Sequence, residues 1–261
     1  MSTSPVHYAA VDRLAVERHP HRSAMGRAAA RAVAAYLCDT INRHGRARIV
    51  FGCAPSQDDF LAALVDPALC GAEIDWRKVT AFHMDDYVGL PGSHPASFRS
   101  YLQRHLLSKV PVGTFHPITA EAADGATVCR TYAAALREQP IDLICLGIGE
   151  NGHIAFNDPP VADFDDPALI KVVELDHACR TQQVNDGCFP NLAAVPPSAY
   201  TLTVPVFRTA RRLSVVVPGP RKAAAARAAL RDPIGPGCPA SVLRLHPSAT
   251  LYLDADSAAQ L

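Results

Sequence analysis

Apolar runs of strand length alternate with stretches of helical character along most of the chain. Strands are predicted at 47–52, 79–84, 141–149, 171–175, 211–219 and 249–256. Helices are predicted at 24–44, 60–64, 96–107, 121–139 and 221–231. This alternation is typical of an α/β fold, a mostly parallel Rossmann-like sheet with helices on both faces. Without a linker or an internal repeat, the sequence predicts one domain over residues 1–261.

Individual residues indicate where some of the predicted helices begin and end. We expect Ser23 to cap the first long helix and Gly45 to end it, because serine accepts N-terminal amides and glycine adopts the left-handed C′ conformation. Ser56 is the expected N-cap of the helix at 60–64. Proline and asparagine interrupt the pattern over 155–210, so the elements of that segment are the least defined.

Three polar clusters directly follow apolar strands. They are Cys53–Gln57, Met84–Tyr87 and Gly149–Pro160. In an open α/β sheet, ligands bind outside the carboxyl ends of the strands. We therefore predict that the three clusters converge at one sheet edge and form a catalytic site.

The cluster at 149–160 offers an acid/base pair. Gly147, Gly149 and Gly152 form a loop in which the backbone can approach a ligand closely. His153 follows this loop, and Asp158 comes five residues later. A histidine beside a carboxylate can transfer protons near neutral pH, although this spacing also fits a histidine that only hydrogen-bonds the loop.

Asp85 and Asp86 are adjacent behind a predicted strand. In extended backbone their side chains point in opposite directions, so one can face a pocket while the other faces the protein. Asp85 is then a candidate base for a proton next to a carbonyl group. From the residues alone, a turn or a helix-cap pair remains the alternative.

Candidate anion-binding residues lie near the same edge. Ser56 and Gln57 stand before a helix N-terminus, which favours anions, although the acidic pair at 58–59 competes there. Lys222 follows the strand at 211–219, and Arg180 is a weaker candidate. A solvated lysine at a helix start is the alternative for Lys222.

Composition and charge narrow the classes of protein to which this chain can belong. The 25 basic and 25 acidic residues cancel and form no charged block, so we expect neither nucleic acid nor a membrane surface as a partner. The N-terminus has no apolar signal segment, and no long apolar run predicts a membrane span. The eight cysteines are scattered without a C-x-x-C pair, which favours reduced thiols in a cytoplasmic protein without a metal site.

Four segments resemble the glucosamine-6-phosphate deaminase family, in the family's order. FHMDDYVGLPGSHPASFRSYL (82–102) resembles the stretch around M-D-E-Y-x-G-L, and DLICLGIGENGHIAFNDPP (142–160) resembles the G-x-G-x-D-G-H-I-A-F-N-E-P signature. The segments at 200–230 and 239–254 resemble the later A-L-T-x-G…G-x-x-K-A-x-A and L-x-x-H-P-x-A motifs.

The resemblance implies a reaction and a role for each matching residue. The family converts glucosamine 6-phosphate to fructose 6-phosphate and ammonia, without metal or redox cofactor. Asp85 would move a proton between C2 and C1 of the open sugar, and His153 would assist ring opening. Asp158 would orient His153, and Lys222 would bind the phosphate.

The chain also departs from the family pattern. Asn151 stands where the family has aspartate, and Asp158 replaces a glutamate. The family's glycine- and threonine-rich phosphate loop is replaced by GCAPSQ (52–57). Its phosphate-binding arginine has no clean match, since Gln182 falls near its place and Arg180 lies two residues away. These changes predict a related amino sugar phosphate as an alternative substrate.

We therefore expect an amino-sugar-phosphate deaminase/isomerase, assigned to the hydrolase class, that binds a sugar phosphate. Two alternatives remain. One is a 6-phosphogluconolactonase, although IAFNDPP (154–160) departs from the motif of that group. The other is a non-catalytic sugar-phosphate-binding protein. The sequence leaves open whether the chain forms a homo-oligomer.

Overall fold

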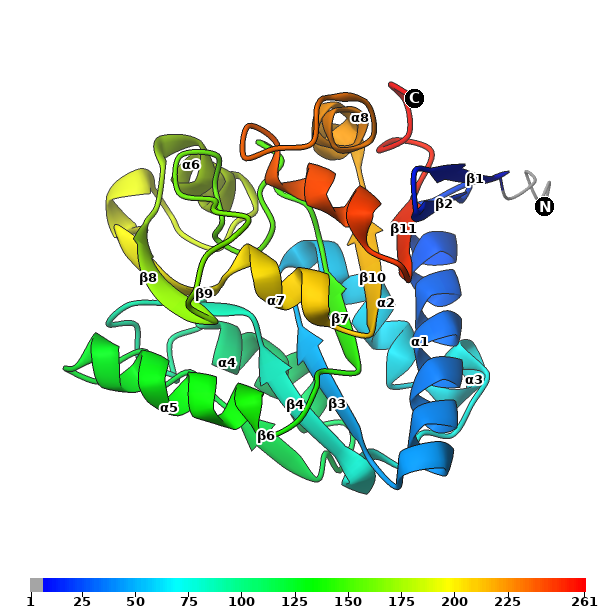
Figure 1. Cartoon of the computed structure of the whole chain (residues 1–261), viewed down its shortest axis with the longest axis horizontal. Coiled ribbons are helices and arrows are strands. Elements are labelled where there is room, and N and C mark those ends of the chain that lie inside the picture. Colours follow the sequence, from blue (N-terminus) through cyan, green and yellow to red (C-terminus); the bar gives the residue numbers. More distant parts are fainter. Residues whose placement is uncertain (1–6) are drawn as a thin grey trace.

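The computed structural model of the protein describes residues 7–261, and its centre is an eight-stranded sheet (Figure 1). The strand order is β1-β2-β11-β10-β7-β3-β4-β6. All neighbours are parallel except β1 and β2, which form an antiparallel hairpin at one edge. The strands are β1 (His7–Val11), β2 (Leu14–Arg18), β3 (Ala47–Phe51), β4 (Val79–His83), β6 (Thr114–His116), β7 (Leu143–Leu146), β10 (Arg212–Val217) and β11 (Ala249–Leu253).

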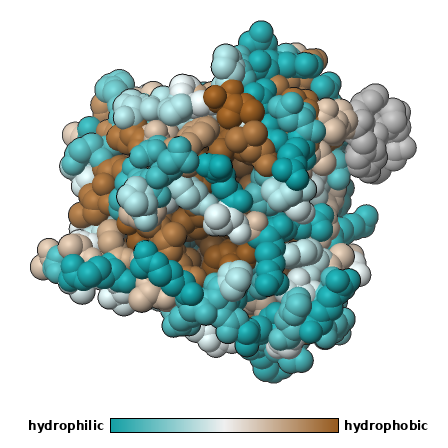
Figure 2. All heavy atoms as spheres, viewed as in Figure 1, coloured by the Kyte–Doolittle hydropathy of each residue, from teal (hydrophilic) through white to brown (hydrophobic). Residues whose placement is uncertain are grey.

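Helices cover both faces of this sheet. One face packs against α1 (Arg22–His44), α2 (Asp58–Leu64), α3 (Pro67–Cys70) and α4 (Phe98–Leu102). The other face packs against α5 (Gly125–Arg137), α7 (Val204–Thr209) and α8 (Ala223–Arg231). Figure 2 shows hydrophobic residues on this second side, between α5 and α7, inside a largely hydrophilic rim. The predicted α/β class with a mostly parallel sheet is confirmed.

The fully buried central strands explain the continuous apolar runs in the sequence. Every residue of β3 is buried, with Ile49 and Phe51 in the cluster under α1 and Val50 in the opposite cluster. Side chains of a strand alternate between faces, so a strand covered on both sides is apolar at most positions, and Arg48 is the buried polar exception in β3.

Helix α1 ends as predicted but begins differently. Gly45 adopts φ 75° and its amide bonds Ile41 O at 2.8 Å, which closes the helix in the left-handed conformation that glycine favours. The expected cap at Ser23 is wrong, because the ring of His21 accepts from the amide of Ala24 and Ser23 lies inside the helix.

Ser56 is not a helix cap either. It lies inside a 3-10 turn, η1 (Pro55–Gln57), which leads directly into α2. The helix predicted at 96–107 is split into α4 and a π-helical turn, η3 (Gln103–Leu107).

A second, antiparallel sheet was not predicted. It has the order β5-β9-β8 and consists of β5 (Asp85–Tyr87), β9 (Ser198–Leu202) and β8 (Ile170–Glu174). The strand expected at 171–175 therefore exists but lies outside the main sheet. Strands β8 and β9 of this sheet and helix α6 (His177–Asn185) lie in the segment 155–210, which the apolar pattern left least defined.

No helix in the part of the chain that the structure describes is both long and apolar enough to cross a membrane.

Asp86 anchors the short strand β5. Its carboxylate accepts from the amides of Tyr87 at 2.9 Å and Phe98 at 3.2 Å. It also accepts from Ser97 Oγ at 3.1 Å and Arg99 Nε at 2.9 Å. The Asp86 side chain is fully buried, so these four donors hold the turn between β5 and α4 in place.

We predict that Asp86→Ala lowers the free energy of unfolding by about 3–5 kcal/mol, because it leaves Arg99 largely buried without this partner. Urea unfolding followed by circular dichroism measures the change. Asp39→Ala is the matched control, since Asp39 pairs with Arg43 at the surface and should change stability by less than about 1 kcal/mol. Equal effects of the two variants would contradict the anchoring role.

Candidate active site

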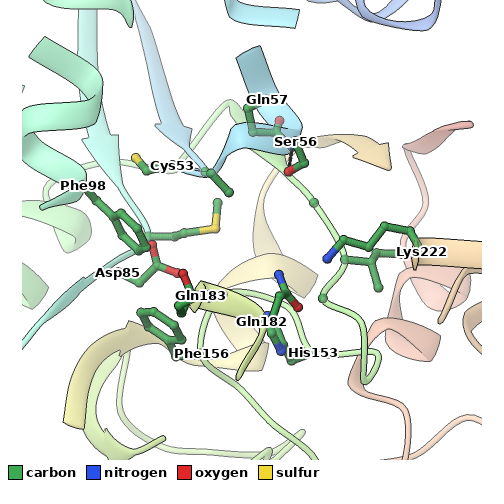
Figure 3. A pocket seen from close by; sticks show the side chains of 17 residues that line it. Cys53, Ser56, Gln57, Asp85, Phe98, His153, Phe156, Gln182, Gln183 and Lys222 are labelled. Atoms are coloured by element: carbon green, nitrogen blue, oxygen red, sulfur yellow. Dashed lines mark hydrogen bonds between the residues drawn. The ribbon is translucent and has the colours of Figure 1, made fainter. Parts of the chain in front are cut away.

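A pocket opens at the carboxyl ends of β3, β4, β7 and β10 (Figure 3). The empty space in it, counted out to the open mouth, is about 510 Å³. The three predicted polar clusters all contribute, so their convergence is confirmed. The lining residues are Gly52, Cys53, Ala54, Ser56, Gln57, Met84, Asp85, Phe98, Gly147, Ile148, Gly149, His153, Ala155, Phe156, Gln182, Gln183 and Lys222.

Asp85 supplies a carboxylate with little solvation. The residue is 6% exposed, and its Oδ1 meets no hydrogen-bond donor among residues 7–261. Burial, followed by the charge of Asp86, raises the pKa of Asp85 well above its usual range. As predicted, the two adjacent carboxylates face different surroundings. Asp85 lines the pocket, whereas Asp86 accepts hydrogen bonds from neighbouring groups of the chain.

His83 fixes the backbone that carries Asp85. Its Nδ1 lies 2.8 Å from Asp85 O, and its Nε2 accepts from the amide of Ile118 at 2.8 Å. Burial lowers the pKa of His83 to about 4, so the ring stays neutral at pH 7. A neutral ring with Nε2 accepting must carry its proton on Nδ1, which donates to Asp85 O.

His153 and Asp158 form a buried pair beside this carboxylate. His153 Nδ1 lies 2.9 Å from Asp158 Oδ1, and the His153 ring lines the pocket. Any Cβ at Gly149 would lie 2.2 Å from the ring, so only glycine lets the loop backbone pass so close. Gly152 adopts φ 85° and donates to Gly149 O at 3.0 Å, which closes the turn before His153.

Asn151 hydrogen-bonds both members of the His153–Asp158 pair. Its Nδ2 donates to Asp158 Oδ1 at 2.9 Å, and its Oδ1 accepts from the His153 amide at 3.1 Å. Burial alone would raise the pKa of Asp158. The hydrogen bond and charge of His153, with the bond from Asn151, outweigh burial and lower it. Asp158 therefore stays ionised and favours an imidazole with its proton on Nδ1.

Lys222 marks a second end of the pocket, on the opposite side from Asp85 in Figure 3. It is 7% exposed and makes no salt bridge to any carboxylate in the described chain. Burial lowers the pKa of Lys222, although the nearby charges of Asp186 and Glu150 oppose this shift. Figure 3 also places Ser56 and Gln57 near this end.

Helix α6 contributes two lining residues that carry no signal of their own in the sequence. Gln183 accepts from the Tyr87 hydroxyl at 2.7 Å, and Gln182 Oε1 accepts from the Glu150 amide at 2.8 Å. In the sequence, Gln182 was notable only because it falls near the place of the family's phosphate-binding arginine. His83 was missed as well, although it directly precedes Met84 and Asp85.

The structure does not bring every predicted residue into the pocket. Arg180 is directed away, since its Nη2 donates to Leu192 O at 2.8 Å and Val195 O at 3.0 Å. It therefore fastens a loop instead of offering its charge to a ligand. Gly152, Asn151 and Asp158 lie behind His153 and shape its position without lining the pocket.

Known proteins resemble this chain in sequence. Residues 20–252 match the family model described as glucosamine-6-phosphate isomerases/6-phosphogluconolactonase. A glucosamine-6-phosphate deaminase of Listeria monocytogenes is 35% identical over 193 residues, covering 74% of this chain and 80% of the relative. One from Exiguobacterium sibiricum is 35% identical over 188 residues, covering 72% of this chain and 73% of the relative.

Solved structures resemble it in fold. A monomeric glucosamine-6-phosphate deaminase superposes with a TM-score of 0.84 at 26% identity, covering 94% of this chain and 99% of its own. A 6-phosphogluconolactonase from Shewanella baltica superposes with a TM-score of 0.76 at 17% identity, with the same coverage. At that identity the second likeness shows the fold alone.

These comparisons correct one prediction. The assignment to the hydrolase class is wrong, because the relatives at 35% identity are named deaminases and the family model names isomerases. The hydrolases among the solved structures, the lactonases, share 20% identity or less with this chain. Isomerisation with loss of ammonia depends on moving protons at carbon, for which a carboxylate base such as Asp85 is suited.

The raised pKa of Asp85 makes a prediction for stability. Below the ordinary aspartate pKa of about 3.9, the folded and unfolded states both hold the proton and the carboxyl group adds no penalty. Above that value the unfolded chain ionises first, so the wild type loses free energy of unfolding until the pH passes the raised folded pKa. Asp85→Asn stays neutral throughout.

We therefore expect Asp85→Asn to stabilise the protein by about 1–3 kcal/mol at pH 7 and by much less near pH 4. Urea unfolding at the two pH values measures the difference. Asp39→Asn at the surface serves as the control, with no comparable gain at pH 7. A gain for Asp85→Asn that is absent, or equal at both pH values, would contradict the buried, unpartnered carboxylate.

Proposed function

Because this chain belongs to the glucosamine-6-phosphate isomerase/6-phosphogluconolactonase family, we propose that it deaminates glucosamine 6-phosphate or a closely related amino sugar phosphate. The products from glucosamine 6-phosphate are fructose 6-phosphate and ammonia. The observation that carries the proposal is the pocket itself, which holds the unpartnered carboxylate of Asp85 and the ring of His153 in one cavity.

Asp85 is the proposed base. In the open-chain sugar, a proton leaves C2 and one is added at C1, which gives an imine at C2. Water then adds to the imine carbon, ammonia departs from it, and the C2 carbonyl of fructose 6-phosphate forms. A carboxylate that is poorly solvated and has a raised pKa is a stronger base than a surface aspartate. Once protonated, the same carboxyl group can return the proton to C1.

His153 is the proposed acid/base for ring opening. Its Nδ1 faces Asp158, which leaves Nε2 for the substrate. Opening the pyranose ring requires a proton on the ring oxygen and removal of one from the hydroxyl at C1. The ionised Asp158 stabilises the imidazolium that forms during this exchange.

Lys222 is the proposed phosphate ligand, with Ser56 and Gln57 beside it. A lysine is a compact point charge that suits a phosphate, and burial strengthens the attraction by excluding water. Lys222 and Asp85 lie at opposite ends of the pocket in Figure 3, which supports binding of the sugar's phosphate away from the reacting carbons.

The pocket draws its residues from Gly52 through Lys222, which supports residues 1–261 acting as one domain. All eight cysteines are free thiols in the structure of residues 7–261, which supports the proposed cytoplasmic location.

We predict that Asp85→Asn lowers the rate of ammonia release from glucosamine 6-phosphate by about 10²–10⁴-fold, the usual contribution of a positioned base. A coupled assay for ammonia measures the rate. The variant should still bind the substrate, which a thermal-shift assay detects.

The same assays separate the alternatives. Ammonia release that does not depend on Asp85 would contradict the proposed base. Hydrolysis of 6-phosphogluconolactone without ammonia release from the amino sugar would instead support a lactonase. Sugar-phosphate binding without any turnover would support a binding protein.

We predict that Lys222→Met raises KM for glucosamine 6-phosphate by about 10–100-fold, with a smaller change in kcat, because a charge-assisted bond to phosphate is worth about 1.5–3 kcal/mol. Steady-state kinetics measures both constants. Lys109→Met is the matched control, since Lys109 lies on a separate surface groove. Unchanged KM in Lys222→Met would rule out Lys222 as the phosphate ligand.

A further inference from the structure

Three side chains of different ligand types meet behind the pocket wall. They are His153, Asp158 and Cys179, and their ligand atoms all lie within 4.8 Å of one another. His153 and Asp158 come from the loop after β7, whereas Cys179 comes from the first turn of α6. The proposed reaction uses the first two residues and has no role for the thiol.

The cluster is buried and contains an oxygen without a partner. His153 is 7% exposed, and Asp158 and Cys179 are each 1% exposed. Asp158 Oδ1 faces His153 Nδ1 at 2.9 Å, whereas Oδ2 finds no hydrogen-bond donor in the described part of the chain. An unpartnered carboxylate oxygen in such a dry setting is a strong potential ligand for a cation.

The backbone holds the thiol in place. Asp176 caps α6 by accepting from the amide of Cys179 at 2.6 Å, and Asn151 Nδ2 lies 3.4 Å from the other oxygen of Asp176. Asn151 also donates to Asp158. One network therefore fixes both the helix that carries the thiol and the loop that carries the other two ligands.

We propose that His153, Asp158 and Cys179 form a binding site for Zn²⁺ or a similar thiophilic divalent cation, and that occupation of the site inhibits the enzyme. Imidazole nitrogen, carboxylate oxygen and thiolate sulfur are the three ligand types that zinc accepts. Binding releases the thiol proton to solvent, and the two negative ligands then neutralise the metal. With three protein ligands, a water can fill the fourth position of the metal.

Inhibition follows because the metal binds atoms of His153 and Asp158 that the proposed reaction uses. A cation on His153 Nδ1 replaces the proton that this nitrogen shares with Asp158, and it also neutralises the carboxylate. The ring can then neither form an imidazolium nor be oriented by Asp158. The inhibitory consequence rests on the proposed function, whereas metal binding does not.

Metal binding is tested without turnover. Wild-type protein, first stripped with a chelator, is titrated with Zn²⁺ by calorimetry, and with Co²⁺ by absorption spectroscopy. We expect one tight site per chain and a thiolate-to-cobalt charge-transfer band. Cys179→Ser should weaken the tight site by at least about 100-fold and abolish the band, because a hydroxyl is a poor zinc ligand.

Cys53→Ala is the matched control, because it removes a different buried thiol, one that lines the pocket and lies outside the proposed ligand set. It should keep both the tight site and the band. The proposal is overturned if the wild type shows no tight site, if the band is absent, or if Cys179→Ser binds as tightly as the wild type. Since the band is measured in the wild type, the test remains decisive even if Cys179→Ser misfolds.

Inhibition is tested separately. Ammonia release should fall in proportion to Zn²⁺ occupancy and recover when a chelator removes the metal, whereas Cys179→Ser should keep its own activity at the same Zn²⁺ concentration. Binding without loss of activity would overturn the inhibitory role. Binding by a protein that never releases ammonia would instead contradict the proposed function and leave the metal site supported.

Discussion

The burial of the Asp85 carboxylate without a hydrogen-bond donor is the constraint on which the rest of the site depends. A buried charge is normally paired, because its desolvation opposes folding. Here the protein binds the neighbouring Asp86 with four donors and leaves Asp85 facing the pocket. The fold thereby keeps a poorly solvated carboxylate, the proposed base, at some loss of stability, as functional sites commonly do.

The two sheets make this arrangement possible. The main sheet ends β4 at His83, and the chain then enters β5 of the small sheet, where Asp85 pairs with Thr201. His83 ties the two strands together through the carbonyl of Asp85. The loop after β7 carries His153 to the same cavity, so the carboxylate and the imidazole face one pocket from different elements.

The parallel strands and much of the pocket lining were predictable from the local pattern of apolar and polar residues. Continuous apolar runs identified the buried parallel strands, and polar residues at their carboxyl ends identified the three clusters that line the pocket. Alternation along an extended segment separated the surroundings of Asp85 from those of Asp86.

The second sheet and the contribution of α6 to the pocket depend on contacts between residues that are distant in sequence. In the small sheet β5 pairs with β9, where Asp85 lies opposite Thr201, 116 positions later (201 − 85), and no local period encodes such pairing. Gln182 and Gln183 look like ordinary polar helix residues until α6 is placed beside the pocket. Arg180 was predicted as an anion ligand from its charge, but its guanidinium binds the carbonyls of a loop.

The most direct measurement of the central claim is a crystal structure of Asp85→Asn with glucosamine 6-phosphate bound. The account predicts one sugar in the pocket, with C2 facing position 85, the ring oxygen near His153 and the phosphate on Lys222. A sugar bound outside this cavity, or one whose phosphate lies at position 85, would contradict it.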